Sequence, residues 1–220
     1  MEFKTKYIAT TKQARYAQFG ELSDQTKYFW FALHGSKMLC EQMIFKFKDF
    51  DPKEHLVIAP EALSRFYLKG FGGDVVATWM TKRDRLKEID DFSNYLSNLY
   101  NHYAQQLPGQ CKKSILAFSQ GVTTTFRWLH ARDESVDNLI AYSGWIPEDI
   151  DLKASKTKLN DIKLIYTYGL EDEFLTPQRI AALSQIIKKN ELRIPIYEYK
   201  GGHKIDRAQL MSLFKSHIEQ

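Results

Sequence analysis

The sequence predicts an α/β fold in three layers, with a mostly parallel sheet covered by helices on both faces. Short apolar and β-branched runs alternate with segments of helical periodicity over most of the 220 residues. Such alternation is typical of parallel strands joined by right-handed crossovers. The length is within the range of one domain, and no linker-like stretch or internal repeat interrupts the chain. We therefore expect a single domain over residues 1–220.

The first part of the chain predicts an antiparallel edge. Two runs rich in aromatic and β-branched residues, Phe3 to Ala9 and Ala14 to Phe19, are separated by four polar residues. This pattern favours an N-terminal hairpin at one edge of the sheet. The continuous apolar run from Tyr28 to Leu33 then predicts a strand buried on both faces, which ends at His34-Gly35.

The next elements are a helix, a strand, an irregular segment and a long helix. Met38 to Phe47 has apolar residues at helical spacing, and Leu56 to Ala59 is a short buried strand stopped by proline. Between Glu61 and Thr81 no period is clear, so we expect a long loop or a lid-like excursion. From Lys82 to Gln106 apolar residues recur every three or four positions, which marks an amphipathic helix.

The second half of the chain alternates strand and helix. Strands are expected at Ser114–Phe118, Leu139–Tyr142, Leu164–Tyr168 and Ile194–Tyr199, and helices at Val122–Ala131, Pro177–Lys189 and Lys204–His217. Ligand sites of such sheets lie at the carboxyl ends of the strands. Residues that directly follow these strands are therefore the first candidates for a functional site.

Composition excludes several function classes. The net charge of +4 is spread in short pairs such as Lys112-Lys113, without the long basic run that would indicate a nucleic-acid partner. Cys40 and Cys111 have no spacing typical of zinc or of a disulfide framework. Metalloprotease, phosphate-loop and dinucleotide motifs are missing, so neither a metal nor a cofactor is expected.

The start of the chain, Met1 to Lys6, lacks the apolar centre of a signal peptide, and no apolar run is long enough to span a bilayer. We therefore expect a cytoplasmic protein without stable membrane insertion. The oligomeric state is left open.

The segment Ala117-Phe118-Ser119-Gln120-Gly121 is the most informative motif. It follows one predicted strand and opens the next predicted helix, which is the layout of a nucleophile elbow. Small residues are needed two positions before and after the serine, where strand and helix backbones nearly touch. Ala117 and Gly121 satisfy this need, so Ser119 is a candidate nucleophile.

A serine hydroxyl needs a base, and the base needs an orienting acid. His203 lies directly after the last predicted strand, behind two glycines that let its backbone turn toward the sheet. Asp172 follows the preceding strand, within the acidic triplet Glu171-Asp172-Glu173, where chemistry alone does not single out one of the three acids. The order serine, aspartate, histidine is that of the α/β-hydrolases, which favours Asp172 as catalytic over a merely solvated loop.

The oxyanion formed in acyl transfer needs aligned N–H donors. Candidates are the backbone N–H of Gln120 and one from the loop His34-Gly35-Ser36. Trp79 and Trp145 fall in loops near the expected site and are candidates for lining a pocket. The segment from Phe66 to Trp79, together with Leu175, would favour a lipid or thioester substrate if it formed a long apolar channel.

Several of these segments together resemble the phospholipase/carboxylesterase family of small α/β-hydrolases, which includes the acyl-protein thioesterases. The resemblance is carried by Phe118-Ser119-Gln120-Gly121, Tyr142-Ser143-Gly144-Trp145-Ile146-Pro147, Gly169 to Asp172 with Thr176-Pro177, and Gly202-His203. It implies a Ser119, Asp172 and His203 triad, oxyanion donors at Gln120 and Ser36, and cofactor-free hydrolysis of esters or thioesters. Ala117 stands where the family usually has glycine.

Three functions are carried forward. The first is a serine carboxylesterase that cleaves small or medium acyl esters through an acyl-enzyme on Ser119. The second is a thioesterase or lysophospholipase-like lipid hydrolase. The third is a non-catalytic binding protein on a hydrolase scaffold, because a fold does not by itself imply a function.

Overall fold

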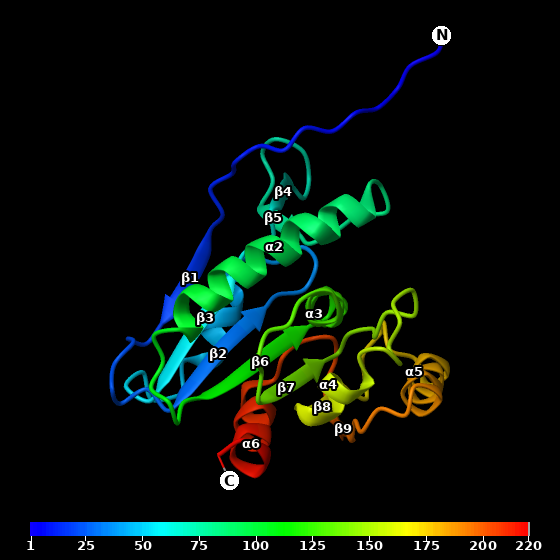
Figure 1. Cartoon of the computed structure of the whole chain (residues 1–220). Coiled ribbons are helices and arrows are strands. Elements are labelled where there is room, and N and C mark those ends of the chain that lie inside the picture. The colour runs from blue at the N-terminus through cyan, green and yellow to red at the C-terminus, as the bar shows by residue number, and fades with distance from the viewer. Residues whose placement is uncertain (220) are drawn as a thin grey trace.

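Figure 1 shows the computed structural model of the chain, in which residues 1–219 are described. Its centre is a seven-stranded sheet in the order β1-β3-β2-β6-β7-β8-β9. In chain order these strands are β1 (Tyr16–Phe19), β2 (Tyr28–Leu33), β3 (His55–Pro60), β6 (Lys112–Phe118), β7 (Asn138–Tyr142), β8 (Lys163–Gly169) and β9 (Ile196–Tyr199). All neighbouring strands are parallel except β1 and β3. The predicted mostly parallel α/β fold is thus confirmed.

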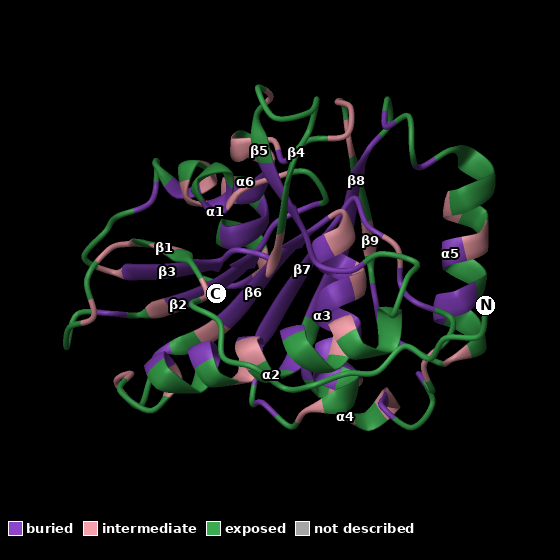
Figure 2. Cartoon of the chain, turned by 90° about the horizontal axis from the view of Figure 1, so that it is seen from above, coloured by how far each residue is buried: buried purple, intermediate pink, exposed green. Residues whose placement is uncertain are grey.

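Helices cover both faces of the sheet, and Figure 2 shows the strands buried between them. One face packs against α2 (Arg85–Ala104), α3 (Gln120–Ala131), α4 (Lys156–Asp161) and α5 (Pro177–Lys189). The other packs against α1 (Cys40–Ile44), the 3-10 helix η1 (Phe45–Phe47) and α6 (Arg207–His217). Strand β2 serves both layers because its side chains alternate: Phe29, Phe31 and Leu33 face the first layer, and Trp30 and Ala32 the second.

The antiparallel edge exists, but its partner differs from the predicted one. Residues 3–9 form no strand, and β1 pairs with β3 instead of with that segment. The side chains of Phe3 and Ile8 are 80% and 92% exposed. Aromatic and β-branched residues favour a strand only where a neighbouring surface covers them, and this segment has no such surface.

The segment expected as a loop between Glu61 and Thr81 is instead a small two-stranded antiparallel sheet, β4 (Ser64–Tyr67) with β5 (Val75–Thr78). Sequence periodicity missed it because β4 does not alternate: Phe66 and Tyr67 are adjacent and both exposed. β5 is hydrogen-bonded to the segment that follows β2: the N–H of Lys37 donates to the carbonyl of Ala77 at 2.9 Å.

The other predicted elements agree with the structure within a few residues, apart from α4, which was not predicted. That helix is polar and has one apolar residue, Leu159, facing the core, so it shows no helical period. Within residues 1–219, no helix combines the length and apolar character needed to cross a bilayer.

Candidate active site

Ser119 lies on a strained turn between β6 and α3. Its backbone has φ 51° and ψ −117°, a conformation that non-glycine residues rarely adopt and that occurs mainly at functional sites. Two close approaches enforce the turn. A β-carbon on Gly121 would lie 2.5 Å from the carbonyl oxygen of Leu33, and one on Gly144 would lie 2.3 Å from that of Ser119. Only glycine fits at either position.

His203 connects Ser119 with Asp172. Its Nε2 lies 2.9 Å from the hydroxyl oxygen of Ser119, and its Nδ1 lies 2.8 Å from Oδ2 of Asp172. The carboxylate of Asp172 is fully buried, and its other oxygen accepts the N–H of Phe174 at 2.9 Å. Because a carboxylate only accepts, Nδ1 of His203 is the donor to Asp172, which leaves Nε2 to accept the proton of Ser119.

The loops that hold Asp172 and His203 are bonded to each other. The N–H of Glu171 donates to the carbonyl of Gly201 at 2.8 Å, and the N–H of Leu170 to that of Tyr199 at 2.9 Å. A β-carbon on Gly169 would lie 2.1 Å from the carbonyl oxygen of Gly201. Close contact of these two loops therefore sets the position of the aspartate relative to the histidine.

The expected oxyanion loop lies against Ser119. A β-carbon on Gly35 would lie 3.0 Å from the β-carbon of Ser119, and Ser36 lines the same cavity as Ser119 and Gln120. Gln120 is the first residue of α3, so its N–H has no acceptor within the helix. The N–H groups of these two residues are thus the candidate oxyanion donors on either side of Ser119.

The side chain of Gln120 attaches the elbow to the end of β5, a role that sequence reasoning did not assign. Its Oε1 accepts the hydroxyl of Thr78 at 3.0 Å and the N–H of Trp79 at 3.1 Å, and its Nε2 donates to the carbonyl of Met80 at 2.9 Å. The indole N–H of Trp79 in turn donates to the carbonyl of His34 at 2.8 Å. The end of β5 therefore braces both the elbow and the oxyanion loop.

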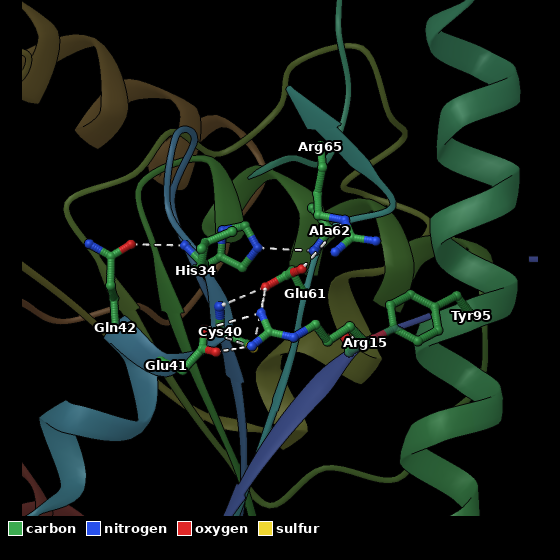
Figure 3. Close-up of polar contacts among 10 residues, drawn as sticks. Arg15, His34, Cys40, Glu41, Gln42, Glu61, Ala62, Arg65 and Tyr95 are labelled. Atoms are coloured by element: carbon green, nitrogen blue, oxygen red, sulfur yellow. Dashed lines mark hydrogen bonds and ion pairs between the residues drawn. The ribbon is translucent and has the colours of Figure 1, made fainter. Parts of the chain in front are cut away.

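The side chain of His34 also supports this loop (Figure 3). Its Nε2 accepts the N–H of Ala62 at 3.0 Å, which leaves Nδ1 as the donor to the carbonyl of Gly35 at 2.7 Å. The imidazole is completely buried, and this burial lowers the pKa of His34. A neutral histidine with one donor and one acceptor matches both contacts.

Residue Glu61, next to Ala62, belongs to a partly buried polar cluster with Arg15, Cys40 and Glu41 (Figure 3). The guanidinium of Arg15 lies 2.7 Å from Glu61 and also pairs with Glu41. The thiol of Cys40 and the two carboxylates offer metal-ligand atoms that lie within 4.8 Å of one another. Here Arg15 pairs with both carboxylates, and burial raises the pKa of Cys40 to about 12, so the thiol fits poorly as a metal-binding thiolate.

A cavity of about 400 Å³ opens beside Ser119 and His203, within the range of small-molecule sites. Among the candidates for pocket lining, Trp145 and Leu175 line this cavity. Trp79 does not, because its ring is buried and its N–H is bonded to His34. Phe66 does not either, because it stands on the exposed face of β4.

A second contact between a serine and a histidine occurs elsewhere. Nδ1 of His130 lies 2.7 Å from the hydroxyl of Ser155, beside a larger hollow of about 810 Å³ at the ends of α3 and α4. Within residues 1–219, no carboxylate is hydrogen-bonded to His130. Ser155 is also in ordinary helical conformation instead of on a strained turn, so this pair lacks the features of a nucleophile and its base.

The fold and the strained serine turn define a class, the serine hydrolases of α/β-hydrolase fold. The family model described as Serine hydrolase (FSH1) matches residues 48–212, so the chain belongs to this serine hydrolase family. No curated protein matches the chain in sequence.

Solved structures agree with this fold. Acyl-protein thioesterase 2 from Zea mays is 17% identical with a TM-score of 0.69, covering 93% of this chain and 97% of the thioesterase. Esterase PE8 is 18% identical with a TM-score of 0.61, covering 94% of this chain and 100% of the esterase. Arabidopsis thaliana SOBER1 is 16% identical with a TM-score of 0.61, covering 87% and 97%. These structures share the fold of this chain, and the family model confirms the resemblance to serine hydrolases drawn from the sequence.

Proposed function

We propose that the chain is a single-domain carboxylic ester hydrolase in which Ser119 is the nucleophile, His203 the general base and acid, and Asp172 the group that orients His203. The observation that carries the proposal is the continuous chain of contacts from Asp172 through His203 to the strained Ser119, with distances of 2.8 and 2.9 Å. Membership of a serine hydrolase family supports it.

Acylation begins when the oxygen of Ser119 attacks the ester carbonyl and His203 takes the hydroxyl proton at Nε2. The N–H groups of Ser36 and Gln120 hold the oxyanion of the tetrahedral intermediate. The imidazolium, stabilised by Asp172, then donates its proton to the departing alcohol. This leaves an acyl group on Ser119.

Deacylation repeats these steps with water as the nucleophile. His203 takes a proton from water, the hydroxide attacks the acyl carbonyl, and Ser119 leaves with the proton returned by His203. The products are a carboxylic acid and the free enzyme. Apart from water, every group that these steps invoke is a side chain or backbone N–H of the chain.

The test is the rate of hydrolysis of p-nitrophenyl esters of increasing acyl length by the wild type and by Ser119→Ala. We expect the variant to keep its fold, checked by circular dichroism, and to lose activity by about 10⁴-fold or more. A fluorophosphonate probe should label the wild type and not the variant. Near-native rates in the variant would show that Ser119 is not the nucleophile.

A thioesterase is the second candidate, since an acyl-protein thioesterase is among the similar structures. Rates on an oxygen ester and a thioester of equal acyl length separate the two activities. If a folded wild type hydrolyses neither substrate and resists the fluorophosphonate probe, the scaffold acts as a binding protein instead.

A further inference from the structure

The wall of the cavity beside Ser119 carries positive charge only. Lys37 and Arg179 both line it, and the ten other lining residues include Ser119, Trp145, Phe174 and His203. No aspartate or glutamate is among these residues. Within residues 1–219, neither Lys37 nor Arg179 forms an ion pair with an acid of the chain. Two cationic side chains therefore line the cavity without an acidic partner.

Arg179 is held in place by neutral groups. One terminal nitrogen of its guanidinium donates to the carbonyl of Phe174 at 2.8 Å, and its central carbon lies 5.8 Å from the ring centroid of Trp145. A guanidinium has five N–H donors, and this carbonyl uses one of them. The other donors are available to a ligand, and the fixed orientation lowers the entropy that binding would cost.

Lys37 directly follows the oxyanion loop in the chain and lines the same cavity. Its backbone has φ 63°, the left-handed region that lysine rarely adopts, and its N–H is bonded to Ala77 on β5. A strained conformation that is held by a neighbouring strand is common at functional sites. The backbone thus fixes the point at the cavity wall from which the Lys37 side chain extends.

We propose that the natural substrate is an ester or thioester that carries a carboxylate or another anionic group, which Lys37 and Arg179 bind while Ser119 attacks the acyl carbon. This inference rests on the proposed hydrolase activity. Arginine binds carboxylates through paired, charge-assisted hydrogen bonds, and a cavity lined by one sign of charge concentrates substrates of the opposite sign. Lys37 and Arg179 are thus specificity-determining residues.

The experiment compares kcat/KM for esters that differ only in charge. For an anion on the acyl side, the pair is mono-p-nitrophenyl glutarate and its methyl ester. For an anion on the leaving group, the pair is the butyrate ester of 4-hydroxybenzoate and that of methyl 4-hydroxybenzoate. The pair with the larger ratio of anionic to neutral kcat/KM identifies the side of the substrate that carries the charge.

In the wild type we expect this ratio to exceed one in one pair and to fall as salt is raised, because exposed charges are screened. In the double variant Lys37→Gln, Arg179→Gln the ratio should fall by about tenfold or more. Arg179→Lys, which keeps the charge without the planar donor pair, should give an intermediate ratio. The double variant Lys188→Gln, Lys189→Gln is the matched control, because it also removes two positive charges, at the far end of α5, and it should leave the ratio unchanged.

Labelling of the double variant by a fluorophosphonate checks that its site is folded. If the two cations only stabilise the oxyanion, the double variant slows both esters of a pair equally, and the constant ratio overturns the inference. A wild-type ratio at or below one in both pairs overturns it as well. In both cases Ser119-dependent hydrolysis of the neutral esters would show that the proposed function still holds. Failure of all esters and of the probe would overturn both proposals.

Discussion

The indole N–H of Trp79 donates a hydrogen bond of 2.8 Å to the backbone carbonyl of His34, the residue that begins the oxyanion loop. The loop is also bonded to β5 through its following residues, since Lys37 donates to Ala77 and Ala77 donates to Met38. The β4–β5 hairpin therefore supports the oxyanion loop through its base, although its tip is exposed. Trp79, which was expected to line the pocket, instead supports the oxyanion loop from within the core.

Trp79→Phe keeps a ring in the core and removes the N–H. We expect kcat for ester hydrolysis to fall about tenfold with little change in KM, because a mobile oxyanion loop weakens transition-state binding more than substrate binding. The unpaired carbonyl of His34 should lower the free energy of unfolding by about 1–2 kcal/mol. Steady-state kinetics and urea unfolding measure the two effects.

Trp128→Phe is the matched control for that variant. The indole of Trp128 is also buried, and its N–H donates to the hydroxyl of Ser97 at 2.9 Å, away from the cavity. It should show a similar loss of stability with an unchanged kcat. If both variants lower kcat equally, the contact between Trp79 and His34 has no specific role in the site.

Gly144→Ala should inactivate the enzyme. The added β-carbon would lie 2.3 Å from the carbonyl oxygen of Ser119 and 2.5 Å from the side chain of Val122, so the nucleophile turn must shift. Displacing a catalytic group by about 1 Å can cost a factor of about 100 in rate, and we expect at least this loss. Gly109→Ala has no atom within 4 Å of its added carbon and should keep full activity; equal activity in the two variants would contradict the model of a tightly packed turn.

The ion pair between Arg15 and Glu61 predicts an asymmetric pattern of stability. The carboxylate is 1% exposed and the guanidinium 45%, so Arg15→Met leaves a buried charge without its nearest partner. We expect a loss of about 2–3 kcal/mol in the free energy of unfolding, below the range for fully buried pairs because Arg15 is partly solvated. Adding Glu61→Gln should restore part of it.

Lys27→Met serves as the control for this pair. It breaks the ion pair between Lys27 and Glu54, in which both side chains are substantially exposed. The free energy of unfolding should therefore fall by less than about 1 kcal/mol. Urea unfolding of the four proteins at pH 7 gives the comparison. A double variant that is less stable than Arg15→Met would contradict the assignment of the loss to an uncompensated carboxylate.

Much of this architecture was predictable from the sequence because it depends on local signals. The buried runs of β2, β3 and β6 are continuous and apolar. The motif around Ser119 also shows directly that a small residue is needed at Gly121, where the strand and helix backbones nearly touch. Chain order then selected Asp172 and His203, which the structure brings together with Ser119.

The features that sequence reasoning missed depend on contacts between distant segments. β1 pairs with β3 because that edge is free, and no local pattern reports which edge is free. Trp79 is bonded to a carbonyl 45 residues earlier. Arg179 reaches the cavity from the first turn of α5, where its position depends on how that helix packs and not on its own sequence.

His55 predicts how stability depends on pH. The side chain is buried at the start of β3, where its Nδ1 accepts the indole N–H of Trp30 at 3.0 Å and its ring stacks on Tyr28. Burial lowers its pKa from 6.5 to about 4. Above pH 6.5 both the folded and unfolded states hold this histidine neutral. As the pH falls from 6.5 toward 4, the unfolded state binds a proton that the folded state does not, and stability is lost.

A pKa difference of this size corresponds to about 3 kcal/mol, so the wild type should lose roughly this much more stability than His55→Gln between pH 7 and pH 4. Glutamine keeps an acceptor for Trp30 and does not titrate. Other groups, including His34, titrate in both proteins and cancel in the difference. Urea unfolding at pH 7, 6, 5 and 4 measures it. Parallel losses in the two proteins would mean that His55 takes up its proton in the folded state near its ordinary pKa.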